Sequence, residues 1–354
     1  MSYIKTKHFK YLLGLLFYFK VLVKDLIGLF DPRVTTIKLL HLDIEPTNIC
    51  NANCVFCAYQ YQSGPTYKTV NFDFVKKLLD AFCEAGGGDI GLTPIVGDPL
   101  VNKDLETIVS ICRKYNKIKN IGITTNGILL TKERFIALRD AGLTNINISM
   151  TFPEKSEYEK IYRNNSFDKL IKNIEDLLEV DCKGVEICLA IRTPRLFLGT
   201  NSLLKKVKSA GWKITRNIFF DDWSGQVANG LIENDLLKRP KRSKHIPCSI
   251  LQSGPHALVS GKITACGCRD LEGKSELSDE NIFKPFYDSG NLQAVYYENM
   301  EVLRRRFLNN NPPEICRNCH HYTPDFRFAN MKDRIIQITF DIREALQFIL
   351  NIKS

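Results

Sequence analysis

The 354-residue sequence predicts an α/β fold, a partial (β/α)6 TIM-like barrel followed by a smaller cysteine-rich region. Between residues 37 and 227, apolar strand-like segments alternate with amphipathic helical segments, which is typical of a parallel sheet with helical crossovers. The strand segments carry few charges, as expected when helices cover the sheet. After residue 227 the alternation stops, and cysteines and loop-forming residues become frequent.

Each element of the alternation has its own signal. The segment 39–46 is apolar and ends at a loop, as a buried strand does. The segment 71–86 is amphipathic, starts at a potential N-cap, Asn71, and ends in glycines, which predicts a helix. Both patterns then repeat along the chain. Further strands are expected at residues 89–96, 118–127, 143–152, 184–192 and 212–220, and further helices at 103–115, 131–142, 166–180 and 202–211.

The chain divides into four predicted segments. They are an N-terminal amphipathic helix (1–36), the barrel (37–227), the cysteine-rich region (228–330) and a C-terminal amphipathic helix (331–354). The C-terminal helix is expected to pack on the barrel or on the N-terminal helix. Apolar residues make up 44% and charged residues 25%, which is typical of a globular protein and excludes a disordered or collagen-like chain.

Part of the net charge of +10 lies in the N-terminal segment. Over residues 4–30, apolar side chains fall on one side of a helix and lysines on the other, and the uncharged stretch is too short to span a bilayer. Two interpretations stay open: a helix lying in a membrane interface, or a helix docked on its own domain. No zinc-finger, homeodomain or RNA-binding motif accompanies the other basic runs, so no nucleic-acid partner is expected.

Three cysteines lie directly after the first predicted strand. Cys50, Cys54 and Cys57 have the spacing C-x3-C-x2-C. Structural zinc normally takes four protein ligands, but no fourth cysteine is near in the sequence and no histidine occurs between residues 42 and 244. Three thiolates on an iron–sulfur cube leave one iron open to a small molecule. The motif therefore predicts an iron–sulfur cluster, with structural zinc or plain loop thiols as the alternatives.

This motif, in this position, resembles that of the radical S-adenosylmethionine (radical SAM) enzymes, and the resemblance covers residues 38–325. It implies that the three thiolates hold a [4Fe–4S] cluster whose open iron binds the amine and carboxylate of SAM. It also implies an enzyme in which one electron cleaves SAM, and the resulting 5′-deoxyadenosyl radical takes a hydrogen atom from the substrate. Phe56 matches an aromatic residue that the family often places beside the adenine.

Further segments match the family at the ends of successive strands. The segment 96–99 is similar to the family's Gly-Gly-Glu-Pro, with Val96 and Asp98 as departures, and 124–127 has the family's Thr-Thr-Asn-Gly. A serine ends the fourth predicted strand and an arginine the fifth. The resemblance implies that these positions bind SAM: Gly97, Asp98, Thr125, Asn126, Ser149 and Arg192.

A second group of cysteines occupies the region 228–330. It resembles the SPASM extension of this family in its shortened, one-cluster form, called twitch, and the segment 223–225 looks like that group's W-x-G. The resemblance implies an auxiliary [4Fe–4S] cluster, for which zinc is the alternative. Four ligands suffice, and either Cys266 or Cys268 is one of them. The candidates are Cys248, Cys266, Cys268, Cys316 and Cys319.

These features lead to a hypothesis about the reaction. A fully ligated auxiliary cluster has no open site, so its expected role is to carry electrons, and it can accept one from a substrate radical. The similarity to one-cluster enzymes suggests an oxidoreductase, a dehydrogenase of a sugar, polyol or aminocyclitol-type substrate. Asp221 and Asp222, which follow the sixth predicted strand, are the candidate catalytic bases. The alternatives are a peptide-modifying maturase that crosslinks or epimerises, and a non-enzymatic zinc or nucleic-acid-binding protein.

The expected partners follow from the same hypothesis. Low-potential clusters need a reducing setting, so we expect a cytoplasmic enzyme whose cysteines are free thiols or ligands. A flavodoxin- or ferredoxin-type protein would supply electrons. If residues 1–30 touch a membrane, the small-molecule substrate is expected to be lipid-linked.

Overall fold

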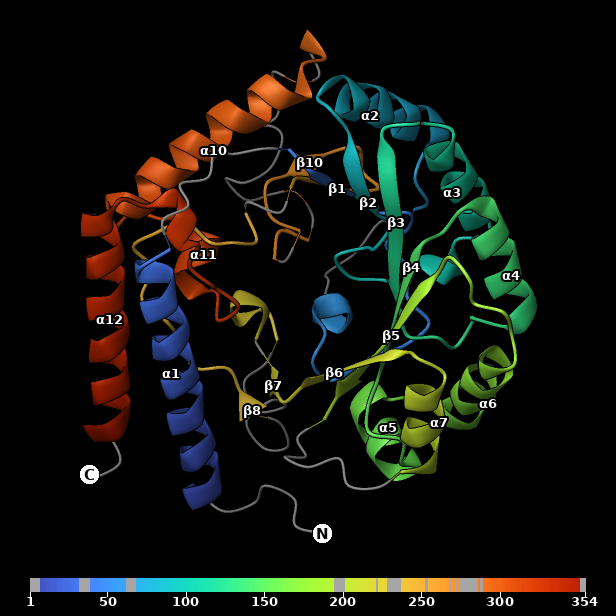
Figure 1. Ribbon diagram of the computed structural model, residues 1–354, viewed down its shortest axis with the longest axis horizontal. Helices are drawn as coiled ribbons and strands as arrows, with labels where there is room; N and C mark the ends of the chain where they lie inside the picture. Colours follow the sequence, from blue (N-terminus) through green and yellow to red (C-terminus); the bar gives the residue numbers. More distant parts are fainter. Residues whose placement is uncertain are drawn as a thin grey trace.

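A computed structural model describes residues 7–31, 39–61, 68–193, 201–220, 222–227, 237–251, 254–267, 269–271, 273, 286 and 289–350 (Figure 1). Its main sheet has eight strands in the order β10-β9-β1-β2-β3-β4-β5-β6. Neighbouring strands from β1 to β6 are parallel. The strands of the main sheet are β1 (His41–Ile44), β2 (Gly88–Gly91), β3 (Ile118–Thr125), β4 (Asn145–Met150), β5 (Glu186–Arg192), β6 (Lys213–Asn217), β9 (His256–Ala257) and β10 (Ile263–Thr264).

Helices connect the parallel strands and cover one side of the sheet. They are α2 (Phe72–Glu84), α3 (Leu105–Arg113), α4 (Lys132–Ala141), α5 (Lys155–Tyr162), α6 (Phe167–Leu178) and α7 (Ser202–Ser209). Figure 1 shows the strands β1 to β6 in an arc, with α2, α3, α4, α6 and α7 along its outer side. The arrangement confirms the predicted α/β fold with a partial barrel.

The helix ends follow the signals in the sequence. The side chain of Asn71 accepts hydrogen bonds from the backbone N–H groups of Asp73 (2.8 Å) and Phe74 (3.2 Å) and so begins α2. Thr131 caps α4 in the same way. Gly142 ends α4 with φ 108°, a conformation that residues with a Cβ rarely adopt.

The structure adds elements to the C-terminal region that the sequence patterns did not predict. Strand β9 pairs with β1 and so extends the barrel sheet, and β10 pairs with β9. A short second sheet joins β7 (Phe219–Phe220) to β8 (Leu237–Lys238). The long helix α10 (Leu292–Leu308) and the short α11 (Glu314–Asn318) fall where only loops were expected. The crossover after β4 also contains α5, which was not predicted.

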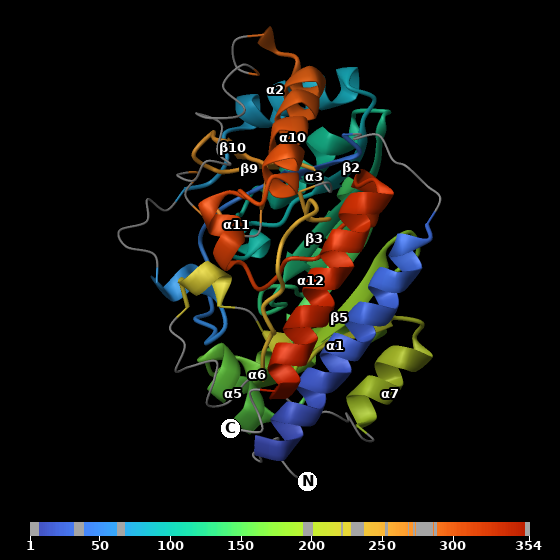
Figure 2. The same cartoon turned by 90° about the vertical axis from the view of Figure 1, so that its left-hand side faces the viewer.

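The two terminal helices pack on each other at the open side of the barrel. They are α1 (Lys7–Leu29) and α12 (Met331–Leu350). Figure 2 shows them side by side and antiparallel. A Cβ on Gly14 would clash with the ring of Phe348, so the absence of a side chain on Gly14 lets the helices approach closely. One side of α1 thus docks on its own domain, as one of the two open interpretations predicted.

A buried ion cluster fixes this helix pair to the C-terminal region. The Arg242 guanidinium lies 2.5 Å from an oxygen of Asp25 on α1 and 2.7 Å from an oxygen of Asp341 on α12. All three side chains are at most 3% exposed. Two carboxylates share one guanidinium, and burial raises the pKa of Asp25 to about 7. Among the described residues, no helix is long and apolar enough to cross a membrane.

Candidate active site

The loop that carries Cys50, Cys54 and Cys57 begins beyond the carboxyl end of β1. Helix α5 holds the middle of this loop, because the N–H of Asn53 donates to the carbonyl of Tyr162 (3.4 Å) and the N–H of Val55 to that of Ile161 (2.9 Å). Gln60, in the short helix η1 (Ala58–Tyr61), donates from Nε2 to the carbonyl of Cys54 (2.9 Å). The three cysteines are partly buried.

The segment with Gly97 and Asp98 packs against the start of this loop. The N–H of Asp98 donates to the carbonyl of Ile49 (2.9 Å), one residue before Cys50. Gly97 has φ 140°, and a Cβ there would lie 3.1 Å from the Ile49 carbonyl oxygen. A glycine therefore suits this position, where the backbone of the β2 loop approaches the cysteine loop.

The carboxylate of Asp98 makes hydrogen bonds to groups within the protein. Its carboxylate accepts hydrogen bonds from the Thr125 hydroxyl (2.9 and 3.0 Å), the Asn126 N–H (2.7 Å) and the Leu100 N–H (3.0 Å). The amide of Asn126 in turn donates to Oδ1 of Asn51 in the cysteine loop (2.7 Å). Burial raises the pKa of Asp98 to about 6, against the effect of these donors. Asp98 thus links the ends of β2 and β3 to the cysteine loop.

The residues at the ends of β4 and β5 form a second chain of contacts. Arg192 Nε donates to the hydroxyl of Ser149 (2.8 Å), and this hydroxyl lies 3.0 Å from that of Tyr162 on α5. The Arg192 guanidinium carbon lies 5.3 Å from the centre of the Phe56 ring. The positive charge of Arg192 favours the thiolate forms of Cys54 and Cys57, although burial raises the pKa of both thiols.

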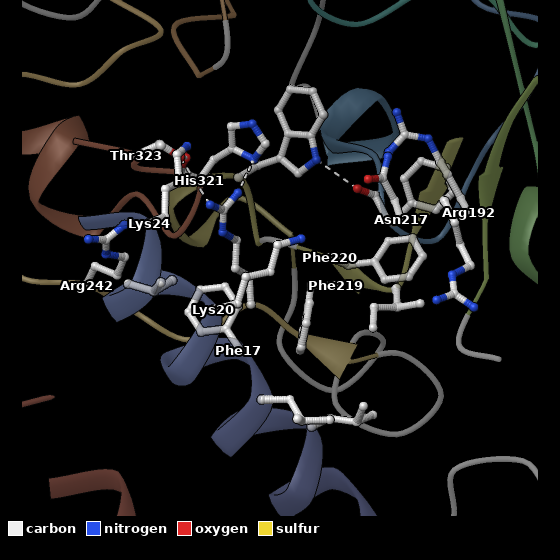
Figure 3. A pocket seen from close by; sticks show the side chains of 18 residues that line it. Phe17, Lys20, Lys24, Arg192, Asn217, Phe219, Phe220, Arg242, His321 and Thr323 are labelled. Carbon is white, nitrogen blue, oxygen red and sulfur yellow. Dashed lines mark hydrogen bonds between the residues drawn. The ribbon is translucent and has the colours of Figure 1, made fainter. Parts of the chain in front are cut away.

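A cavity of about 590 Å³ opens beside Phe56 and Arg192 (Figure 3). Its volume is in the usual range for small-molecule sites. Figure 3 shows Phe17, Lys20 and Lys24 reaching it from α1, with Phe220 and Arg192 opposite. No acidic side chain is among the described residues that line it. Its basic side chains are Lys20, Lys24, Arg192, Arg216, Arg239 and Arg242, joined by His321.

Of the two candidate bases, the structure describes only Asp222. Asp221 lies outside the described residues. Asp222 is buried, its Oδ2 lies 3.8 Å from Nε2 of His320, and it is not among the residues around the cavity. The structure therefore gives Asp222 no contact with a substrate bound there.

Cysteines of the C-terminal region meet at a second, small apolar pocket. Its walls include Cys248, Cys266, Cys316 and Cys319. Burial raises the pKa of Cys316, and the nearby Cys248 and Cys319 add to the effect. Cys268 lies outside the described residues. The structure thus brings together four of the five predicted cysteines.

A short path of contacts joins the two groups of cysteines. The indole N–H of Trp223 donates to the carbonyl of Phe56, between Cys54 and Cys57 in sequence (2.7 Å). The hydroxyl of Ser224 donates to the carbonyl of Ile315, next to Cys316 (3.1 Å). The guanidinium carbon of Arg269 lies 4.6 Å from the centre of the Trp223 ring. The segment 223–225 thus contacts both cysteine groups.

Both donor sets consist of cysteine thiols, the usual ligands of iron–sulfur clusters. Within the described residues, no group of three or more Cys, His, Asp or Glu side chains is arranged to hold one metal ion. In a [4Fe–4S] cube each thiolate binds a different iron, so the sulfur atoms stand farther apart than around one ion. Three thiols on one loop with a cavity beside them suit a cluster with an open iron.

Fold and site together define a radical SAM domain. Residues 44–192 match the family model of the Radical SAM superfamily, so this part of the chain is a radical SAM domain. A [4Fe–4S] cluster and SAM are the cofactors of this family, and such enzymes use a small-molecule substrate and a reductant. The predictions of the superfamily, of an enzyme and of these cofactors are confirmed.

Curated relatives are named as GTP 3′,8-cyclases or as molybdenum cofactor biosynthesis proteins. A GTP 3′,8-cyclase of Petrotoga mobilis is 32% identical over 151 residues, 42% of this chain and 45% of that protein. The molybdenum cofactor biosynthesis protein moc-5 of Caenorhabditis elegans is 38% identical over 138 residues, 38% of this chain and 22% of that protein. The chain thus spans less than half the length of these relatives.

Solved structures share the fold at low identity. BtrN in complex with AdoMet and 2-DOIA has a TM-score of 0.52 and 14% identity, covering 82% of this chain and 96% of that chain. Streptococcus suis SuiB bound to the precursor peptide SuiA has a TM-score of 0.51 and 14% identity, covering 72% and 66%. At this identity they show the fold alone.

The expected reaction needs correction. The names of the relatives describe a cyclase of GTP, so the prediction of a sugar, polyol or aminocyclitol dehydrogenase is wrong. The inference went from a redox-active cluster to alcohol oxidation, but a cluster that carries electrons does not specify which carbon radical it serves. The contribution of α1 to the cavity was also missed, because Lys20 and Lys24 were interpreted only as the polar side of an amphipathic helix.

Proposed function

We propose that this chain is a radical SAM enzyme that acts on a phosphate-bearing small molecule, of the purine nucleoside triphosphate class named in its relatives. The observation that carries the proposal is the cavity beside the cysteine loop, whose charged walls are all basic in the described part of the chain. Arginine and lysine donors arranged in this way suit phosphate oxygens.

The cavity also suits a purine ring. Phe17, Phe219, Phe220 and Trp223 contribute aromatic surfaces to the same walls. A flat base gains contact area by stacking on such rings, while its phosphates meet the basic side chains. A polyol without phosphate groups would offer these basic side chains no anionic oxygens.

The proposed roles of the first site follow from its contacts. Cys50, Cys54 and Cys57 would hold the [4Fe–4S] cluster, which together with SAM supplies the 5′-deoxyadenosyl radical. Arg192 and Phe56 would lie beside SAM at the entrance to the cavity. Ser149 orients Arg192 by accepting its Nε–H.

The adjoining turns would complete the SAM site. Asp98 would bind SAM through its main chain, since its carboxylate already accepts hydrogen bonds from Leu100, Thr125 and Asn126. This carboxylate keeps the Gly97 and Asn126 turns in place beside the cysteine loop.

We further propose an auxiliary [4Fe–4S] cluster held by Cys248, Cys266, Cys316 and Cys319, in the manner of a twitch domain. The ammonium of the partly buried Lys244 lies near three of these thiols and would offset the negative charge of the cluster. The contacts of residues 223–225 with both cysteine groups support electron exchange between the clusters. A flavodoxin- or ferredoxin-type donor and a cytoplasmic setting remain predictions.

The test is anaerobic turnover with a deuterated nucleotide. Reconstituted enzyme, SAM and a low-potential reductant are incubated with perdeuterated GTP, ATP or guanosine, and 5′-deoxyadenosine is analysed for deuterium. We expect transfer from a triphosphate and none from guanosine, because guanosine lacks the groups that the basic walls bind. SAM cleavage without transfer from either triphosphate would reject the substrate class and leave the radical SAM chemistry intact.

A further inference from the structure

The α1/α12 pair has an apolar outer face in addition to the face that packs on the protein. On α1, the residues directed inward or toward α12 include Gly14, Tyr18 and Asp25. The other side of α1 carries large, exposed apolar side chains at helical spacing. They include Leu12, Leu16, Phe19, Val23, Ile27 and Phe30, which directly follows the helix.

Helix α12 repeats this pattern. Its inward side includes Arg334, Gln337 and Asp341, all buried. The exposed apolar side chains are Met331, Ile335, Ile342, Leu346, Ile349 and Leu350. Their spacing forms one stripe along a helix of about 30 Å, at about 1.5 Å per residue.

The two stripes lie on the same side of the pair. The helices are antiparallel and pack through Gly14 and Phe348 (Figure 2). On each helix, viewed from its N-terminus to its C-terminus at 100° per residue, the exposed apolar residues are rotated away from the contact side in the same sense. Because the two helices run in opposite directions, this rotation turns both stripes toward the same outer face of the pair, one on each side of the line of contact. Elsewhere, the large exposed apolar side chains of the described chain are dispersed: Leu40, Tyr297 and Val302.

The exposed charges around this face are basic. Lys20, Lys24, Lys332 and Arg343 are exposed on the two helices. The acids of the described parts of these helices turn inward: Asp25 and Asp341 bind Arg242, Asp333 lies 3.0 Å from a ring nitrogen of His245, and Glu344 accepts from Ser243 (2.6 Å). An apolar stripe edged by lysine and arginine is typical of a helix that lies in an anionic membrane interface.

We propose that the outer face of α1 and α12 docks the enzyme on the surface of an anionic lipid bilayer. The apolar stripes would enter the boundary between headgroups and acyl chains, and the basic side chains would meet the lipid phosphates. Leu16, Lys20 and Lys24 also line the cavity beside the cysteine loop, so the cavity would open close to the membrane surface.

The test is sedimentation of the full-length, cluster-loaded protein with vesicles of phosphatidylcholine, with and without phosphatidylglycerol. We expect binding to the anionic vesicles that weakens as salt increases. Phe19→Gln combined with Ile27→Gln should reduce binding at least about tenfold, since both side chains lose apolar burial in the bilayer. These residues are 68% and 70% exposed, so the substitutions leave the core intact.

Matched variants test whether vesicle binding depends on this face or on any exposed apolar side chain. Leu40→Gln with Val302→Gln changes side chains that are 60% and 56% exposed and lie away from the helix pair, and should leave binding unchanged. Lys332→Gln with Arg343→Gln should weaken binding to anionic vesicles roughly thirtyfold at low salt, from two lost basic groups.

Three outcomes would overturn the proposal. One is absence of binding to anionic vesicles while the protein retains its iron and its melting temperature. Another is equal loss of binding in the Leu40/Val302 variant. The third is a soluble dimer that the Phe19/Ile27 variant dissociates, without vesicle binding, because a second copy of the chain would then cover the face.

Discussion

The two groups of cysteines are built in different ways. Cys50, Cys54 and Cys57 share one short loop, and backbone hydrogen bonds from α5 and from the β2 loop hold it. Cys248, Cys266, Cys316 and Cys319 come from separate segments and meet only when the C-terminal region folds onto the barrel. The cysteines of the first site are therefore neighbours in sequence, whereas long-range packing brings those of the second site together, and damage should affect the two sites differently.

The largest expected difference is between removing one cysteine from each group. Cys50→Ala should reduce SAM cleavage by at least roughly a thousandfold, because the catalytic cluster loses one of three ligands. Cys316→Ala should keep SAM cleavage within about tenfold and lower the iron from about eight to about four atoms per chain. Iron analysis and 5′-deoxyadenosine release measure both effects.

The control for this pair is Cys83→Ala, a half-buried cysteine of α2 outside both groups. It should retain full iron content and activity. If Cys316→Ala kept all its iron, the auxiliary cluster would be absent or held by other residues.

The next prediction concerns the long-range packing. Arg242→Leu leaves Asp25 and Asp341 buried without their cation, which should lower the free energy of unfolding by about 3–5 kcal/mol. Replacing all three residues by leucine should recover most of this loss. Denaturant unfolding measures the effect, and equal stability of Arg242→Leu and wild type would mean that the ion cluster does not hold the helix pair.

The sequence was informative where the determinants are local. The C-x3-C-x2-C motif, the Asn71 cap and the six strands depend on neighbouring residues. The strands and this cap appear as predicted, except that Phe219 and Phe220 belong to the second sheet. The cysteine-rich region was harder to predict, because α10 buries Tyr296 and Phe307 against distant parts of the chain. The N-cap of α10 was a signal that could have found this helix, since the side chain of Asn291 accepts from the N–H of Ala294. The helix α5 could have been found from the spacing of Tyr158, Ile161 and Tyr162.

The cavity combines a residue of the cysteine loop, Phe56, with residues that are distant from this loop in sequence, such as Lys20 of α1. Lys20→Gln should raise KM for the nucleotide roughly five- to tenfold with kcat nearly unchanged, since it removes one charged donor from the binding walls. Steady-state kinetics measures this split. Lys169→Gln, an exposed change on α6, is the control, and an equal KM change in both variants would contradict a specific role for Lys20.

The smallest expected effect is a pH dependence at the junction of the two regions. Glu45 accepts hydrogen bonds from the N–H of Ile95 (3.2 Å) beside β2 and from that of Val259 (3.1 Å) beside β9, and burial raises its pKa from 4.5 to about 7. The folded state therefore binds more protons than the unfolded state between these values. The contribution of Glu45 to stability is present below pH 4.5 and is lost as the pH rises through 7.

Glu45→Gln isolates this contribution, because glutamine does not titrate and has one acceptor oxygen for the two donors. The variant should be less stable at low pH, and its free energy of unfolding should fall less steeply between pH 5 and 7 than that of the wild type. Denaturant unfolding of cluster-free protein across this range measures both slopes. Identical slopes would show that Glu45 does not change its protonation on folding, and that the contact between β1, the β2 loop and β9 is insensitive to pH.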